Sequence, residues 1–136
     1  MLSEKEISNL IKDAREAREK AYAPYSGFSV GAALLASSGV VYRGCNVENA
    51  SFGATICAER VAIGAAVAAG ERVFRAIAVT AGGGPVTPCG ICRQVMAEFS
   101  KDGGFAVICD ADTGRSISNP EALMPEAFTE FEPEEK

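Results

Sequence analysis

The amino-acid sequence predicts a three-layer α/β domain in which helices flank a mixed β-sheet. Segments with helical periodicity alternate with short apolar segments typical of buried strands. Their order is helix, hairpin, helix, strand, helix, strand. The chain has 136 residues and a hydrophobic content of 48%, which can bury a core and fits one domain over residues 1–136.

The N-terminal segment predicts an amphipathic helix. Ser3 and Glu6 have the spacing of a capping box, in which each side chain satisfies a backbone N–H of the first turn. Apolar residues then recur at helical spacing to about Tyr22, where Pro24 and Gly27 interrupt the pattern. The expected buried face consists of Ile7, Leu10, Ile11, Ala14 and Ala17.

A hairpin and a second helix are expected next. Residues 28–36 and 40–45 are two strand-like segments joined by a tight turn, and a polar loop follows over residues 46–55. Residues 57–69 form an alanine-rich helical pattern that Gly70 ends. The small side chains of its expected face require a close neighbour, and they are Ala58, Val61, Ala62 and Ala65.

The second half predicts strand, helix and strand again. Residues 76–80 indicate a strand buried on both faces, and a glycine-rich loop follows them. A helix is expected from Cys89, with Phe99 on its inner face. Residues 105–109 indicate another buried strand, and residues 116–118 indicate an edge strand.

The charge balance limits the classes of partner. The formal net charge is −5, and the 13 Lys and Arg residues are scattered rather than gathered in a basic patch. A nucleic acid or an anionic membrane is therefore not expected as a partner, whereas a neutral small molecule is permitted. No signal peptide is visible, and the longest apolar stretch is too short to span a bilayer, so we expect a cytoplasmic protein.

The cysteine and histidine counts narrow the chemistry. Five cysteines, an odd number, argue against a disulfide framework and leave metal binding or simple burial as alternatives. The chain has no histidine, so Ser–His and Cys–His catalysis and every His-containing metal site are excluded. Acid–base chemistry near neutral pH then falls to a carboxylate, a cysteine or a lysine.

Three cysteines stand at the starts of two predicted helices. Cys89 and Cys92 are separated by two residues, and a helix N-terminus favours the thiolates that bind zinc. Alone, this pair also fits a redox motif or two buried thiols. Cys57 begins the other helix, after Thr55 as a plausible N-cap. Three thiolates on one zinc ion would leave the fourth position for water, as in catalytic sites.

Charged residues adjoin these cysteines. Glu59 is placed to take a proton from water and pass it to a substrate nitrogen, although a first-turn glutamate also stabilises a helix dipole. Zinc with three thiolates carries a net charge of −1, which Arg60 or Arg93 could offset by donating hydrogen bonds to the sulfurs. Either arginine could instead be a solvated surface charge.

A polar pair follows the predicted hairpin. Alternation places Asn46 and Glu48 on the same side of the chain, where an amide and a carboxylate could match the hydroxyls of a sugar. Polar loops often contain such pairs, so the signal is weak alone. Cys45 and Cys109 lie in apolar segments and are interpreted as buried filling residues.

Five segments together resemble the cytidine deaminases in their all-cysteine form. They are residues 57–60, 88–94, 25–33, 44–50, and 123–125 with Phe128. The resemblance implies a three-layer α-β-α fold with a five-stranded mixed sheet. It also implies zinc-dependent hydrolysis of cytidine and deoxycytidine to uridine and deoxyuridine in pyrimidine salvage, with release of ammonia.

The same resemblance implies residue roles. Cys57, Cys89 and Cys92 would bind zinc, Glu59 would protonate N3 and then the leaving amino group, and Arg60 would hydrogen-bond the thiolates. The implied substrate-binding residues are Phe28 at the base, Asn46 and Glu48 at the ribose, and Ala58. In the homotetramer that the resemblance implies, a neighbouring subunit would add Ala50, Phe52 and Phe128. Position 52 departs from the family, where tyrosine is common, so its hydroxyl contact is lost.

Three alternatives stay open at this point. A blasticidin S deaminase would share the zinc motifs, and a polynucleotide deaminase is disfavoured by the acidic charge. A non-catalytic structural zinc module, or a redox protein using Cys89 and Cys92, is the third. A structural site needs a fourth ligand, which only Cys45 or Cys109 could supply in a chain without histidine.

Overall fold

Five strands form one mixed sheet at the centre of the molecule, and the computed structural model describes residues 2–133. The strand order is β2-β1-β3-β4-β5, in which β3 and β4 are parallel and the other neighbours are antiparallel. The strands are β1 Gly31–Ala36, β2 Val41–Cys45, β3 Phe74–Thr80, β4 Ala106–Ala111 and β5 Gly114–Ser118. This sheet confirms the predicted fold class.

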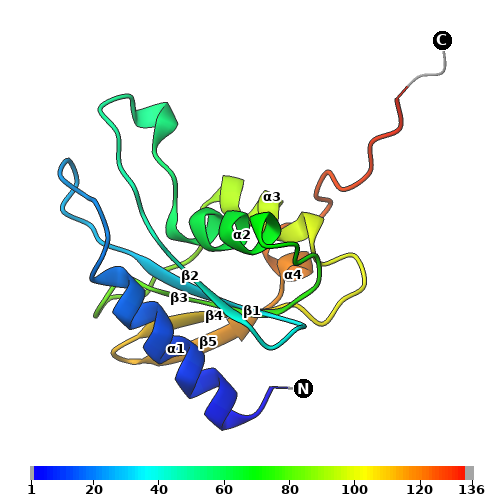
Figure 1. Cartoon of the computed structure of the whole chain (residues 1–136), viewed down its shortest axis with the longest axis horizontal. Coiled ribbons are helices and arrows are strands. Elements are labelled where there is room, and N and C mark those ends of the chain that lie inside the picture. The colour runs from blue at the N-terminus through cyan, green and yellow to red at the C-terminus, as the bar shows by residue number, and fades with distance from the viewer. Residues whose placement is uncertain (1, 134–136) are drawn as a thin grey trace.

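Helices cover both faces of the sheet (Figure 1). α1 lies on one face, whereas α2 and α3 lie on the other with the short helix α4. The helices are α1 Glu4–Arg18, η1 Phe52–Ala54, α2 Ala58–Ala68, α3 Gly90–Glu98 and α4 Pro120–Leu123. Within residues 2–133, no helix is long and apolar enough to span a membrane.

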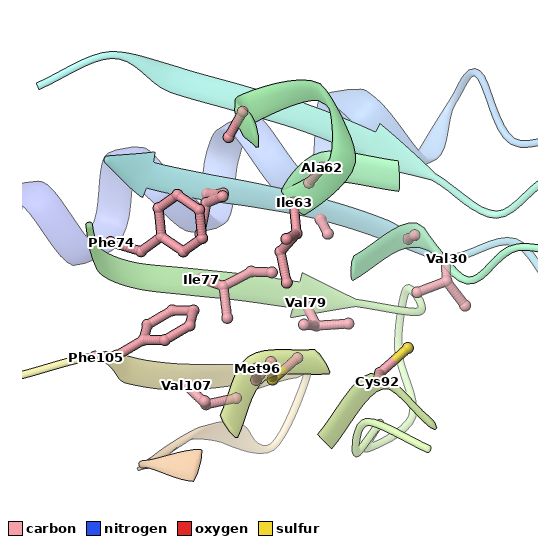
Figure 2. Packing of buried hydrophobic residues seen from close by; sticks show 14 of the residues in the cluster. Val30, Ala62, Ile63, Phe74, Ile77, Val79, Cys92, Met96, Phe105 and Val107 are labelled. Atoms are coloured by element: carbon pink, nitrogen blue, oxygen red, sulfur yellow. The ribbon is translucent and has the colours of Figure 1, made fainter. Parts of the chain in front are cut away.

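Each face of the sheet has its own hydrophobic cluster. Leu10 and Ala14 of α1 pack against Ala78 of β3, on the face opposite α2 and α3. The larger cluster lies under α2 and α3, and Figure 2 shows Cys92 at one end of it, beyond Val79. The buried thiol of Cys92 thus stands where the core ends, which places the site at the edge of a rigid layer.

A glycine lets α2 approach the sheet closely. A Cβ atom added at Gly44 of β2 would lie 2.3 Å from the carbonyl oxygen of Ala58. The close neighbour that the small face of α2 requires is therefore β2. The predicted face was partly wrong, because Ala65 is exposed and Val61 is half-buried. The buried residues of α2 are Ala58, Glu59, Ala62, Ile63 and Ala66.

Several element boundaries differ from the prediction. The capping box of Ser3 is present, but α1 ends at Arg18 rather than near Tyr22. β1 begins at Gly31 rather than at residue 28, because the side chain of Asn46 binds the backbone of the preceding residues and replaces part of the strand ladder there. The helix α4 was not predicted, although Asn119 accepts the hydrogen bond of an N-cap.

Candidate active site

The N-terminal ends of α2 and α3 converge on a group of three thiols. Cys57 is the N-cap of α2 and Cys89 is the N-cap of α3, both in extended conformation, and Cys92 follows in the first turn of α3. The three sulfur atoms lie within 4.8 Å of one another, and the Sγ atoms of Cys57 and Cys89 are 3.7 Å apart. Thr55 is not the N-cap of α2, since its hydroxyl accepts a hydrogen bond from Asn49 instead.

The spacing and chemistry of these sulfurs fit zinc. Sulfurs bound about 2.3 Å from one tetrahedral zinc ion lie about 3.8 Å apart, close to the 3.7 Å between Cys57 and Cys89. Among residues 2–133, the group includes neither Cys45 nor Cys109. The described chain therefore offers three thiols and no fourth cysteine, which fits a catalytic site better than a structural one.

Arg60 supports the thiol group, whereas Arg93 does not. An Nη of Arg60 lies 3.4 Å from the Sγ of Cys57, and it also donates to the carbonyl oxygen of Thr55. The contact with Cys57 raises the pKa of Arg60. Arg93 instead donates to the carbonyl oxygens of Pro88 and Leu123, at 2.7 and 3.0 Å. Of the two arginines considered for charge compensation, only Arg60 is placed for that role.

The Nε of Arg60 is a second feature of this side chain that bears on charge. In the part of the chain that the structure describes, the buried Nε of Arg60 has no hydrogen-bond partner. A buried donor without a partner is costly, and an Nη of the same guanidinium lies 3.4 Å from the Sγ of Cys57, so the surroundings of the thiol group are suited to negative charge. Three thiolates around one zinc ion would supply that charge.

The thiols of Cys57 and Cys92 shift each other's pKa. A hydrogen bond from Cys92, with further help from Arg60, lowers the pKa of Cys57 to about 5. The same bond to Cys57, together with burial, raises the pKa of Cys92. The pKa values of Cys57 and Cys92 are therefore shifted in opposite directions, with Cys57 the more acidic thiol. Zinc ligands must be deprotonated, so metal binding would release the remaining protons.

Glu59 lies beside the thiols in the first turn of α2. Its side chain is buried, with the residue only 4% exposed, and burial raises its pKa. Its carboxylate is not part of the thiol group that could hold a metal ion. A carboxyl group with a raised pKa transfers protons more readily near neutral pH, so the environment of Glu59 suits a general acid–base.

Asn46 and Glu48 hold a neighbouring loop. The amide of Asn46 accepts from the Val30 N–H at 2.9 Å and donates to the Phe28 carbonyl at 2.8 Å. Glu48 accepts from the N–H groups of Tyr25 and Ser26, at 2.9 and 3.1 Å, and from the Ser26 hydroxyl. The Ser26 hydroxyl is the main cause that lowers the pKa of Glu48. These loop contacts of Asn46, Glu48 and Ser26 were not predicted.

The remaining predicted substrate residues do not share one environment. Ala58 is fully buried next to Cys57, whereas Phe28 is about half exposed. Ala50, Phe52 and Phe128 are exposed on the isolated chain. The ring of Phe52 packs edge-on against Tyr25, with 6.1 Å between ring centroids. The loop that carries η1 extends away from the sheet (Figure 1).

The comparison with known families decides the assignment. Residues 4–107 match the family model described as "Cytidine and deoxycytidylate deaminase zinc-binding region". The chain belongs to this family. Membership makes zinc the cofactor of this family member, which agrees with the three converging thiols.

Individual relatives agree with this membership. A protein named "Cytidine deaminase" from Sporosarcina psychrophila is 46% identical over 125 residues, which cover 91% of this chain and 92% of the relative. One of the same name from Halalkalibacterium halodurans is 50% identical over 130 residues, covering 88% and 92%. A crystal structure of cytidine deaminase from Burkholderia pseudomallei has a TM-score of 0.85 and 47% identity, covering 93% of this chain and all of that one.

Proposed function

We propose that the protein hydrolyses cytidine and deoxycytidine to uridine and deoxyuridine, with release of ammonia. The observation that carries this proposal is the convergence of three thiols and the buried carboxyl group of Glu59 at two helix starts, in a chain of the zinc-binding deaminase family. Relatives named "Cytidine deaminase" that align over most of this chain support the substrate. A single catalytic domain over residues 1–136 is part of the proposal.

Cys57, Cys89 and Cys92 would hold zinc. When bound, zinc supplies the Lewis acidity that activates a water molecule for attack on C4 of the base. Because three thiolates leave the centre with a net charge of −1, Arg60 is assigned to offset that charge through its contact with Cys57. Cys89 is exposed and Cys92 is buried, so the thiol group has an open side and a closed one.

Glu59 would move the protons of the reaction. Its carboxylate would take a proton from the attacking water and transfer it to N3 of the base. It would then take the proton of the new hydroxyl group at C4 and give it to the amino group, which leaves as ammonia while C4 becomes a carbonyl. Burial raises the pKa of Glu59, which makes the carboxyl group a better proton acceptor than an exposed carboxylate. A side chain packed in the first turn of α2 is also fixed in position, which favours repeated transfer between the same atoms.

Asn46 and Glu48 would bind the ribose, with Phe28 and Ala58 at the base. The amide of Asn46 already makes two hydrogen bonds to the loop, and its oxygen and NH₂ group each keep further capacity. Glu48 is likewise held by Ser26 before any ligand arrives. Both side chains are therefore oriented in advance, which lowers the entropic cost of binding.

We further propose a homotetramer in which Ala50, Phe52 and Phe128 contact the substrate of a neighbouring subunit. Phe52 is 75% exposed and Phe128 is 67% exposed, and exposed aromatic residues favour an interface. Sedimentation of the purified protein tests the tetramer, and a monomer at micromolar concentration would contradict it. A cytoplasmic location is proposed because the three thiols must stay reduced to bind zinc.

Ammonia release from cytidine by the purified, zinc-loaded protein tests the main proposal. We expect turnover together with about one zinc ion per chain, the stoichiometry of a site with three ligands and water. Assays on blasticidin S under the same conditions provide the comparison. Zinc binding without turnover of cytidine would refute the proposed function.

A further inference from the structure

Two adjacent side chains of α3 hold the C-terminal segment. The Nε2 of Gln94 donates to the carbonyl oxygen of Phe128 at 2.5 Å, and the Oε1 of Gln94 accepts from the N–H of Phe128 at 3.3 Å. Arg93 donates to the carbonyl oxygen of Leu123 at 3.0 Å. The segment that ends at Phe128 is thus fixed to the helix that carries Cys92.

The two contacts of Gln94 are specific to one residue. Its amide satisfies both the N–H and the C=O of Phe128, as a neighbouring strand would, and so fixes the peptide on each side of that Cα atom. Phe128 is nevertheless 67% exposed, so this anchoring does not serve to bury its side chain. Phe131 is 76% exposed, and within residues 2–133 it makes no hydrogen bond to α3.

An exposed aromatic ring on a fixed backbone is already oriented for binding to another molecule. Holding the backbone in advance removes part of the ordering cost that binding would otherwise carry. We propose that Gln94 is a positioning residue, which sets where the Phe128 ring is presented to the nucleoside. This inference rests on the proposed function, because it requires that Phe128 touch the substrate of a neighbouring subunit in the proposed homotetramer.

The kinetic test replaces Gln94 with methionine, which keeps the length of the side chain and removes both hydrogen bonds. We expect KM for cytidine to rise by about fivefold, the loss expected for roughly 1 kcal/mol, with kcat and zinc content close to those of the unchanged protein. Phe128→Ala should raise KM at least as much. Because Gln94 acts through Phe128, the double variant should match Phe128→Ala alone.

The controls separate this role from general stability. Glu98→Ala alters the same helix at a residue that forms an ion pair with Lys101, and Phe131→Ala removes a second exposed aromatic side chain of the C-terminal segment. Both should leave KM unchanged. Hydrogen exchange of the peptide that contains Phe128 should become faster in Gln94→Met and stay unchanged in Glu98→Ala.

The outcomes distinguish the two proposals. Absence of cytidine turnover in the unchanged protein refutes the proposed function. If the unchanged protein is active, the positioning role is overturned by any of three results in Gln94→Met: an unchanged KM, unchanged exchange at Phe128, or a KM effect that multiplies with that of Phe128→Ala.

Discussion

Replacing Glu59 with glutamine removes the proposed proton carrier and keeps the shape of the site. Glu59 is 4% exposed, so an isosteric amide preserves the packing of α2. General acid–base catalysis contributes about 10²–10⁴-fold, or about 3–5 kcal/mol of barrier. Because Glu59 serves both N3 and the leaving group, we expect kcat to fall by about 10⁴-fold, the upper end of that range, with zinc content retained. Residual activity within about tenfold of the unchanged protein would refute the proton-carrier role.

The same substitution makes a second, independent prediction about stability. Burial raises the pKa of Glu59 above its ordinary value of 4.5. A raised pKa means that the folded state favours the protonated form, so this stabilisation is present below pH 4.5 and is lost as the pH rises through the folded pKa. Metal-free Glu59→Gln should therefore gain Tm relative to the metal-free unchanged protein as the pH rises. If the difference in Tm between Glu59→Gln and the unchanged protein shrinks with rising pH, the raised pKa of the buried Glu59 is contradicted.

Three further perturbations follow from individual contacts. Arg60→Ala should weaken zinc binding by about 10–100-fold in a chelator competition, whereas Arg60→Lys should recover part of the affinity by restoring the charge. Gly44→Ala places a Cβ 2.3 Å from a backbone oxygen of α2, so urea unfolding should show a loss of about 1–3 kcal/mol or more. Gly64→Ala, on the open face of the same helix, should instead be neutral or stabilising. Ser26→Ala should raise the pKa of Glu48 and move the acid limb of kcat/KM to higher pH.

The order of elements could be predicted because it depends on local patterns. The capping box of Ser3, the stop at Gly70 and the apolar run of β3 each depend on residues within a few positions of one another. The start of β1 could not be predicted in the same way. It is set by Asn46, a residue 16 positions from Val30, whose side chain takes the hydrogen bond that the Val30 N–H would otherwise donate in the ladder.

In the candidate site, too, local patterns predict some features and long-range contacts determine the others. The thiols of Cys57 and Cys89 were predictable, because each stands at a helix start that follows a strand and a loop. The choice between Arg60 and Arg93 was not, since both adjoin a ligand-bearing turn and only their long-range partners separate them. The role of Gln94 depends on a contact across 34 positions, for which no local pattern exists.

A phenylalanine at position 52 fits the loop in which Tyr25 contacts Glu48. Its ring packs edge-on against Tyr25, and the N–H of Tyr25 donates to Glu48. A ring at position 52 therefore supports the loop that orients Glu48 through aromatic packing, which needs no hydroxyl group. Because Phe52 is 75% exposed, the missing hydroxyl group removes a polar group from the surface of the chain. The change from tyrosine should thus affect the subunit contacts of the proposed homotetramer more than the orientation of Glu48 within its own chain.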